Sequence, residues 1–292
     1  MDTLHIIGAK GNIGSRLVEK TEGKYDIRKV VSPGRPHLFS VDSGYYGLNL
    51  ADDLSSYDFY TLKEGDTVAF TAAISEPSVC AKQFDLAIKV NVESTGEFIQ
   101  QALDRGCKVI FLSSDVVYGR VEDEFDESQP LDPLGVYAEM KAIVEKRFIG
   151  HSRFKVLRLS YNFFKDDRFT TYLRTCASED TVADLFDPFG RSIVHRDDTV
   201  DAIISLYNNW DVCEEGVINC GGPETLSRVE FAEILSELVV QDLMTKVTTP
   251  DAKFYEDRPA IVAMRSPLLE KVLGRPARSM RDAIDMEFKD GN

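Results

Sequence analysis

Short apolar runs alternate with longer amphipathic stretches through the first half of the chain. Five runs have the length of buried strands: residues 4–7, 26–31, 66–70, 108–112 and 154–159. Between them, stretches such as 84–104 and 136–148 show helical spacing of apolar positions. Repeated alternation of strand and helix is typical of a parallel sheet covered by helices on both faces. The pattern therefore predicts an α/β fold with a doubly wound parallel sheet of the Rossmann type.

The first predicted strand leads directly into a glycine-rich turn and then a helix over residues 15–20. Gly8, Gly11 and Gly14 follow a Gly-x-x-Gly-x-x-Gly spacing, which differs from the common Gly-x-Gly-x-x-Gly fingerprint. Glycines let the backbone approach a pyrophosphate, and the start of the following helix attracts its negative charge. A plain strand–helix turn also uses glycine, but three glycines directly after an N-terminal strand favour a dinucleotide-binding turn.

The end of the second predicted strand bears on the choice between NAD and NADP. An acidic residue at that place would accept hydrogen bonds from the adenosine ribose and select NAD. The chain has Ser32 and Arg35 instead, a hydroxyl and a cation that can accommodate a 2′-phosphate. The sequence thus favours NADP(H), with NAD(H) as the alternative. A turn over residues 33–36 with a solvated arginine explains the same residues about equally well.

Tyr137 and Lys141 stand one helical turn apart at the start of the predicted helix over 136–148. A cation beside a phenol favours the phenolate, so we expect a lowered tyrosine pKa and proton transfer near neutral pH. Ser114 follows the strand over 108–112, at the edge where open α/β sheets place ligands. This spacing is common on helix surfaces, and its significance depends on the surrounding motifs.

Composition narrows the class of protein. The formal net charge is −15, which argues against nucleic acid or an anionic membrane as a partner. Apolar runs are too short to span a bilayer, and we expect no signal peptide. The five cysteines form no Cys-x-x-Cys pair, so a disulfide framework or a metal site is not expected. A reduced, cytoplasmic setting fits best.

The regular alternation weakens after residue 160. A helix over 199–207 and a strand over 216–219 are still expected, and Ser227 with Glu230 suits a helix capping box. We expect a dinucleotide-binding domain over residues 1–160, to which residues 193–220 return. A smaller, mixed substrate-binding lobe would then consist of the remaining residues, 161–192 and 221–292.

Together these motifs resemble the extended short-chain dehydrogenases/reductases. The resemblance rests on matches in family order over nearly the whole chain: Gly8/Gly11/Gly14, residues 71–73, Asn91-Val92, residues 113–119, residues 137–141 and residues 194–198. Within the family, the short length and the serine–aspartate before the Val-Tyr-Gly turn are most similar to the dTDP-4-dehydrorhamnose reductase branch.

The resemblance implies roles for individual residues. Tyr137 would be the general acid/base, Ser114 would polarise the substrate carbonyl, and Lys141 would bind the nicotinamide ribose. The implied cofactor site comprises Gly8, Gly11, Asn12, Ile13, Gly14, Ser32, Arg35, Asn49, Leu50, Thr71, Ala72, Ala73, Asn91, Ser113, Tyr137 and Lys141. The implied substrate site comprises Ser114, Asp115, Arg191 and Arg258, whose two arginines would hold a nucleotide-sugar diphosphate.

The activity implied by the resemblance is an NAD(P)H-dependent reductase of a nucleotide-activated 4-keto sugar. Family dehydratases carry an Asp-Glu pair, whereas Val116 follows Asp115 here, so elimination of water is disfavoured. Two alternatives are a nucleotide-sugar 4-epimerase with tightly bound NAD and a non-catalytic dinucleotide-binding regulatory subunit. The expected partner is a nucleotide-diphosphate sugar, and a homodimer is left open as an alternative to a monomer.

Overall fold

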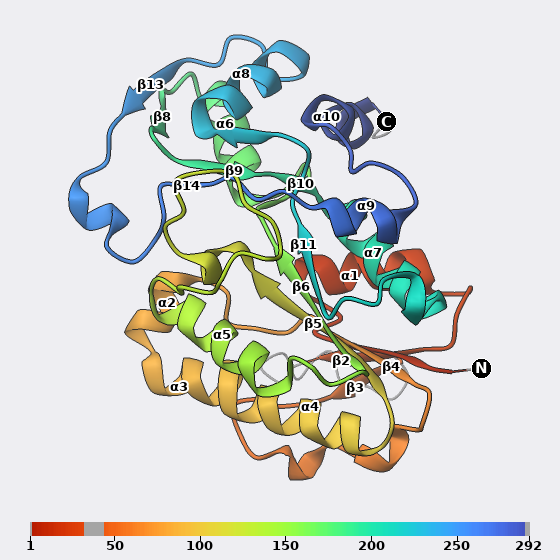
Figure 1. Ribbon diagram of the computed structural model, residues 1–292. Coiled ribbons are helices and arrows are strands. Elements are labelled where there is room, and N and C mark those ends of the chain that lie inside the picture. The colour runs from red at the N-terminus through yellow and green to blue at the C-terminus, as the bar shows by residue number, and fades with distance from the viewer. Residues whose placement is uncertain (1, 32–43, 290–292) are drawn as a thin grey trace.

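A seven-stranded parallel sheet forms the centre of the molecule (Figure 1). The computed structural model describes residues 2–31 and 44–289. The strand order is β11-β6-β5-β4-β1-β2-β3, and every pair is parallel. The strands are β1 (Leu4–Ile7), β2 (Ile27–Val31), β3 (Tyr45–Gly47), β4 (Thr67–Phe70), β5 (Lys108–Ser114), β6 (Phe154–Leu159) and β11 (Val217–Cys220). This confirms the predicted doubly wound sheet.

Helices cover both faces of this sheet, which explains why its strands read as continuous apolar runs. One face packs against three helices: α1 (Asn12–Thr21), α7 (Arg196–Asn208) and α9 (Pro267–Leu273). The other packs against α4 (Thr95–Asp104) and α5 (Val136–Phe148). All four residues of β1 and of β4 are buried, as expected for strands covered on both sides.

The predicted helix over residues 84–104 is divided by a π-helical turn. It comprises α3 (Phe84–Ile88), the π-helical segment Lys89–Ser94, and α4. Asn91 lies in the π-helical segment and is buried. Single π-helical turns inside helices often occur at functional sites, because they redirect a side chain inward.

Three small sheets and three helices lie above the carboxyl ends of the main strands in Figure 1. The small strands are β7 (Asn162–Phe163), β8 (Ala183–Phe186), β9 (Gly190–Ser192), β10 (Val194–His195), β12 (Thr225–Ser227), β13 (Thr245–Thr248) and β14 (Ile261–Val262). The helices are α6 (Arg168–Ser178), α8 (Arg228–Leu238) and α10 (Met280–Lys289), which share one apolar core. The predicted capping box of Ser227 and Glu230 is present at the start of α8.

The division of the chain into two lobes stays a prediction. In its favour, β11 joins the edge of the main sheet, as expected for a segment returning to the first domain. One C-terminal segment departs from the expected division. Its residues Leu269, Val272 and Ala277 pack into the core on the face of the main sheet that α1 and α7 cover. Within residues 2–31 and 44–289, no helix has the length and apolarity needed to cross a membrane.

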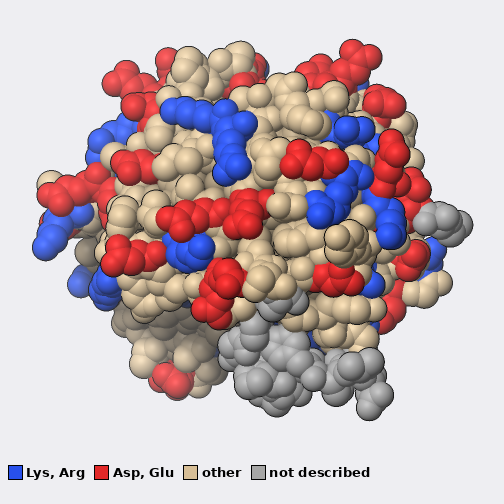
Figure 2. Space-filling view, turned by 90° about the horizontal axis from the view of Figure 1, so that it is seen from below, with Lys and Arg blue, Asp and Glu red and all other residues tan. Residues whose placement is uncertain are grey.

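Acidic and basic side chains are interspersed on the face shown in Figure 2. Some form ion pairs that join distant segments. Arg16 of α1 donates two hydrogen bonds to Asp197 at the start of α7, from Nε to Oδ1 at 2.7 Å and from Nη2 to Oδ2 at 2.8 Å. Although burial opposes ionisation, these hydrogen bonds hold the pKa of Asp197 well below its usual range. The ionised pair therefore fixes α1 against α7.

This pair predicts a loss of stability in acid. A carboxyl group with a depressed pKa stabilises the fold above its unfolded pKa of about 4 and loses that contribution as the pH falls further. We expect Asp197→Asn to lower the free energy of unfolding by about 2 kcal/mol at pH 7 and to flatten its decline below about pH 4. Urea unfolding at several pH values measures both. Glu214→Gln, at an exposed position, is the control. If the free energy of unfolding fell as steeply with decreasing pH in Asp197→Asn as in the wild type, the prediction would be contradicted.

Candidate active site

The glycine turn between β1 and α1 leaves no space for side chains. Gly8 has a φ of +95°, and a Cβ there would lie 2.8 Å from both the Ala72 backbone nitrogen and Thr71 Oγ1. A Cβ on Gly14 would overlap the carbonyl oxygen of Gly8. The turn therefore depends on glycine at both positions, and it passes directly beside the end of β4.

Helix α1 begins at Asn12 with Gly11 as its N-cap, so the capping residue contributes no side-chain oxygen. The first amides of a helix lack carbonyl partners within the helix and carry partial positive charge. Asn12, Ile13 and Gly14 form that first turn. A bare glycine turn followed by unshielded helix amides fits the pyrophosphate of a dinucleotide.

The residues after β4 lie beside this turn and are held by the backbone and by Asn91. Thr71 Oγ1 donates to the Ile7 carbonyl at 2.8 Å. Asn91 accepts from the Ile74 amide and donates to its carbonyl, both at 2.9 Å. Since both ends of its amide are engaged, Asn91 positions the loop at residues 71–74. Its proposed contact with a cofactor stays a prediction.

The remaining predicted cofactor residues have varied settings. Ser113 is buried at the end of β5, and its hydroxyl has no partner among the described residues. Leu50 is buried, and Asn49 donates to Asp52. Ser32 and Arg35 lie outside the described residues, so the structure neither supports nor contradicts their predicted role.

Lys141 lies against the end of β5, the strand that ends at Ser114, and Tyr137 stands one helical turn before Lys141. Lys141 Nζ donates to the Leu112 carbonyl at 2.7 Å, two residues before Ser114. The same nitrogen is 4.5 Å from the Phe111 ring centroid and 5.8 Å from that of Tyr137. Strand end and helix start thus bring the predicted catalytic residues into one region.

The protonation of this pair differs from the expectation. Burial, together with the nearby Cys80 and Asp115, raises the pKa of Tyr137 above its ordinary value. Burial lowers the pKa of Lys141 to about 8. The predicted lowering of the tyrosine pKa is wrong for this structure, because the half-buried phenol is desolvated and Lys141 directs a hydrogen bond to a carbonyl. Tyr137 is consequently protonated at neutral pH and is suited to donate a proton.

Asp115 and Arg191 contact each other between the end of β5 and β9. Asp115 Oδ2 accepts from Ser160 Oγ at 2.9 Å and lies 3.8 Å from Arg191 Nε. Arg191 also donates to three backbone carbonyls, those of Gly190, Pro259 and Ala260. Burial raises the pKa of Asp115, while the Arg191 charge opposes that effect. Both side chains are largely used within the protein, and their predicted contact with substrate stays untested.

A cavity of about 350 Å³ combines aromatic rings with two arginines, Arg228 and Arg258. It is lined by Phe169, Tyr172, Asp184, Phe186, Phe189, Arg228, Phe254 and Arg258. The Arg228 guanidinium lies 3.8 Å from the Phe169 ring centroid, and that of Arg258 lies 4.7 Å from the Phe254 centroid. Sequence reasoning found Arg258 and missed Arg228, which directly follows the recognised cap Ser227.

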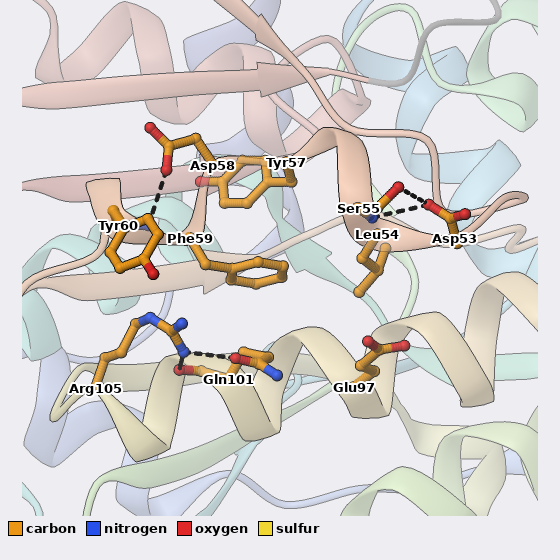
Figure 3. Close-up of a pocket in the computed structure, with 10 residues that line it drawn as sticks. All are labelled: Asp53, Leu54, Ser55, Tyr57, Asp58, Phe59, Tyr60, Glu97, Gln101 and Arg105. Carbon is orange, nitrogen blue, oxygen red and sulfur yellow. Dashed lines mark hydrogen bonds between the residues drawn. The ribbon is translucent and has the colours of Figure 1, made fainter.

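A larger cavity of about 720 Å³ lies elsewhere, between residues 53–60 and helix α4 (Figure 3). Figure 3 shows the Phe59 ring over the helix. Arg105 lies on the same helix and donates a hydrogen bond to the Gln101 side chain. None of the predicted site residues lines this cavity. Size alone therefore does not identify the site, and the predicted site residues lie instead at the ends of β1, β4 and β5.

Comparisons with known proteins agree with this arrangement. The family described as RmlD substrate binding domain matches residues 1–291. The spore coat polysaccharide biosynthesis protein SpsK of Bacillus subtilis (strain 168) is 24% identical over 242 residues, covering 81% of this chain and 83% of that protein. N-acetyl-alpha-D-glucosaminyl-diphospho-ditrans,octacis-undecaprenol 4-epimerase of Escherichia coli O157:H7 is 29% identical over 177 residues, covering 59% of this chain and 48% of that relative.

Solved structures show the same fold. A hypothetical dTDP-4-dehydrorhamnose reductase from Sulfolobus tokodaii superposes with a TM-score of 0.81 at 21% identity, covering 97% of this chain and 99% of the other. UDP-glucuronic acid 4-epimerase from Bacillus cereus, in complex with UDP-glucuronic acid and NAD, superposes with a TM-score of 0.76 at 19% identity, covering 98% of each chain. The chain therefore belongs to the RmlD substrate binding domain family, among the extended short-chain dehydrogenases/reductases.

Proposed function

We propose that the protein is an NAD(P)H-dependent reductase of a nucleotide-activated 4-keto sugar. The observation that carries the proposal is the hydrogen bond from Lys141, beside the Tyr137 ring, to Leu112 near the end of the strand that carries Ser114. The match of residues 1–291 to the family described as RmlD substrate binding domain supports it. So does the likeness in fold to a structure titled as a hypothetical dTDP-4-dehydrorhamnose reductase.

Each catalytic residue has a role that its environment favours. A reduced nicotinamide dinucleotide, when bound, supplies the hydride. Tyr137, protonated because burial raises its pKa, donates a proton to the oxygen of the keto group as negative charge develops there. Ser114 donates a hydrogen bond to the same oxygen, and Lys141 adds positive charge beside the Tyr137 ring.

The cofactor is proposed to be NADP(H). Lys10 of the glycine turn lies with its Nζ 4.3 Å from the Tyr45 ring centroid, and Lys29 of β2 approaches the same ring at 4.7 Å. Lys29 also donates to Glu22 at 2.9 Å, so Lys10 is the cation beside β2 and β3 that we propose for a 2′-phosphate. NAD(H) is the alternative, and several related structures are complexes with NAD.

The aromatic cavity is the proposed site of the nucleotide. Its rings offer faces on which a base can stack, and Arg228 and Arg258 offer planar guanidinium groups that match diphosphate oxygens. Burial lowers the pKa of Arg228, yet it stays far above neutrality. The cavity therefore presents permanent positive charge to an anionic ligand.

A 4-epimerase with tightly bound NAD is the second candidate. It would use the same Ser114, Tyr137 and Lys141. The observation in its favour is the fold shared with the Bacillus cereus enzyme, whose structure holds UDP-glucuronic acid and NAD. Cytoplasmic location and a homodimer stay predictions under either function.

An assay with added NADPH separates the two candidates. We expect the purified protein to oxidise one NADPH per molecule of a dTDP- or UDP-4-keto-6-deoxy sugar. A 4-epimerase would instead be purified with NAD and would interconvert UDP-sugars without added cofactor. Epimerisation under those conditions, with no NADPH oxidised by any keto sugar, would refute the reductase proposal.

A further inference from the structure

A buried ion pair lies one helical turn beyond Lys141. The Glu145 side chain of α5 is fully buried, and Arg158 of β6 is 3% exposed. Arg158 donates to Glu145 Oε2 from Nη2 at 2.7 Å and from Nε at 3.1 Å. Charges are buried at a high cost unless they are paired and hydrogen-bonded, so an arrangement of this kind calls for an explanation.

Further hydrogen bonds fix the pair in place. Arg158 Nη1 donates to the Tyr118 hydroxyl at 2.7 Å, and that hydroxyl donates to Asn219 Oδ1 at 2.7 Å. Asn219 Nδ2 in turn donates to the Arg265 carbonyl at 3.0 Å. The guanidinium is therefore held by α5, by the turn after β5 and, through Tyr118, by β11. The Glu145 carboxylate has one position available to it.

Glu145 also stands one helical turn after Lys141 on the same buried side of α5. On its own helix Lys141 faces Glu145 and Tyr137. From β5 it meets the Phe111 ring and the Leu112 carbonyl. From α2 (Pro77–Lys82) it meets Cys80, whose pKa burial raises, so that the thiol is neutral. Among these described neighbours, Glu145 is the one carboxylate.

We propose that Glu145 is a positioning residue of the active site: held by Arg158, its carboxylate keeps the Lys141 ammonium charged and directed at the Leu112 carbonyl, beside Tyr137. The inference rests on the proposed catalytic role of Lys141. Arg158 prevents Glu145 from turning toward Lys141 and replacing that carbonyl as its partner. The Glu145–Arg158 pair thus stabilises the Lys141 ammonium, which lies next to the proposed proton donor Tyr137.

Stability in alkali reports on Lys141 without any need for turnover. Burial lowers the pKa of Lys141 to about 8 in the folded chain, whereas an unfolded lysine titrates near pH 10.4. Between these values Lys141 binds more protons in the unfolded state, so its contribution makes the free energy of unfolding rise with pH. Buried thiols such as Cys107 and Cys213, whose pKa values are raised, act in the opposite direction, so the rise due to Lys141 is measured as the difference between the profiles with and without Lys141→Met, and its start marks the titration of Lys141 in the folded state.

Urea unfolding between about pH 6 and about pH 10 tests the proposal. Glu145→Gln should move the start of the rise to lower pH by roughly one unit, because one nearby opposite charge shifts a pKa by about that much or more. Glu139→Gln is the matched control, since it removes the same group from an exposed position of the same helix. If Glu145→Gln does not fold, the double replacement Glu145→Met/Arg158→Leu keeps the site apolar and should give a smaller shift in the same direction, because the opposing charge of Arg158 is removed as well.

Introducing Glu145→Gln into the Lys141→Met variant separates an effect of Glu145 on Lys141 from an effect of Glu145 on packing. There, replacing Glu145 should leave the alkaline pH dependence unchanged, because the titrating group is gone. Coincident profiles of wild type and Glu145→Gln, or an equal shift with and without Lys141, would overturn the proposal. A protein that reduces no keto sugar but shows the shift would refute the proposed function and leave this inference standing.

Discussion

Replacing Tyr137 with phenylalanine is expected to lower turnover by about 10²–10⁴-fold, the contribution that a positioned general acid makes. The hydroxyl is the group that donates the proton, and the change removes only that atom. The ring packs in a buried cluster with Cys80, Ala87 and Met140, so a phenylalanine should keep the fold. Binding of NADPH should stay within a few-fold of the wild type, because the glycine turn and α1 are untouched. Steady-state rates with a 4-keto sugar and calorimetric titration with NADPH measure the two effects.

Tyr57→Phe is the matched control for this experiment. Tyr57 is a buried tyrosine, and it lies by the cavity between residues 53–60 and α4, away from Tyr137. Removing its hydroxyl should change neither turnover nor cofactor binding. If Tyr137→Phe kept most of the wild-type turnover, Tyr137 would not be the proton donor, and the reductase mechanism proposed for this site would fall.

The main sheet could be predicted from sequence because its signals are local and strong. β6 occupies the predicted residues 154–159, and α5 the predicted residues 136–148. Strands that are covered on both faces are recognised as continuous apolar runs, without alternation of apolar and polar residues. The helices between them are recognised by apolar positions that recur with the helical period. The turn at Gly8 is similarly local, since positive φ and lack of space both require glycine there.

The aromatic cavity could not be predicted in the same way, because its walls come from separate segments. Phe186, Arg228 and Phe254 belong to β8, α8 and a short helical turn, far apart in sequence. The small strands of this region have two to four residues, too few for a periodic signal. Only tertiary packing brings the arginines and rings together.

The direction of the Tyr137 pKa was predicted wrongly for a related reason. Spacing along a helix shows that Tyr137 and Lys141 are neighbours, but not how deeply either is buried. Nor does it show that Lys141 donates its hydrogen bond to Leu112. Desolvation outweighs the attraction between a cation and a phenolate when the cation is directed elsewhere and the phenol is buried.

The arginines expected to hold a diphosphate should respond differently to replacement. Arg228→Met and Arg258→Met should each weaken binding of UDP or dTDP by about 10–100-fold, the loss expected from one charge-assisted hydrogen bond. Arg191→Met should instead lower the free energy of unfolding by about 3 kcal/mol, because it leaves the buried Asp115 without its cation. Calorimetric titration and urea unfolding measure these effects. Arg174→Met, on the exposed side of α6, is the control.

The reason for this difference is where the guanidinium hydrogen bonds go. Arg191 donates to the carbonyls of Pro259 and Ala260, and so it holds the segment that carries Arg258. Arg228 and Arg258 line the cavity and contact aromatic rings. Arg258 donates from Nε to Asp257 at 2.9 Å, which leaves its two terminal nitrogens as donors for a ligand. If Arg191→Met weakened nucleotide binding as strongly as Arg228→Met while stability stayed unchanged, Arg191 would be a direct ligand of the diphosphate. The pair that binds the nucleotide would then have to be reassigned.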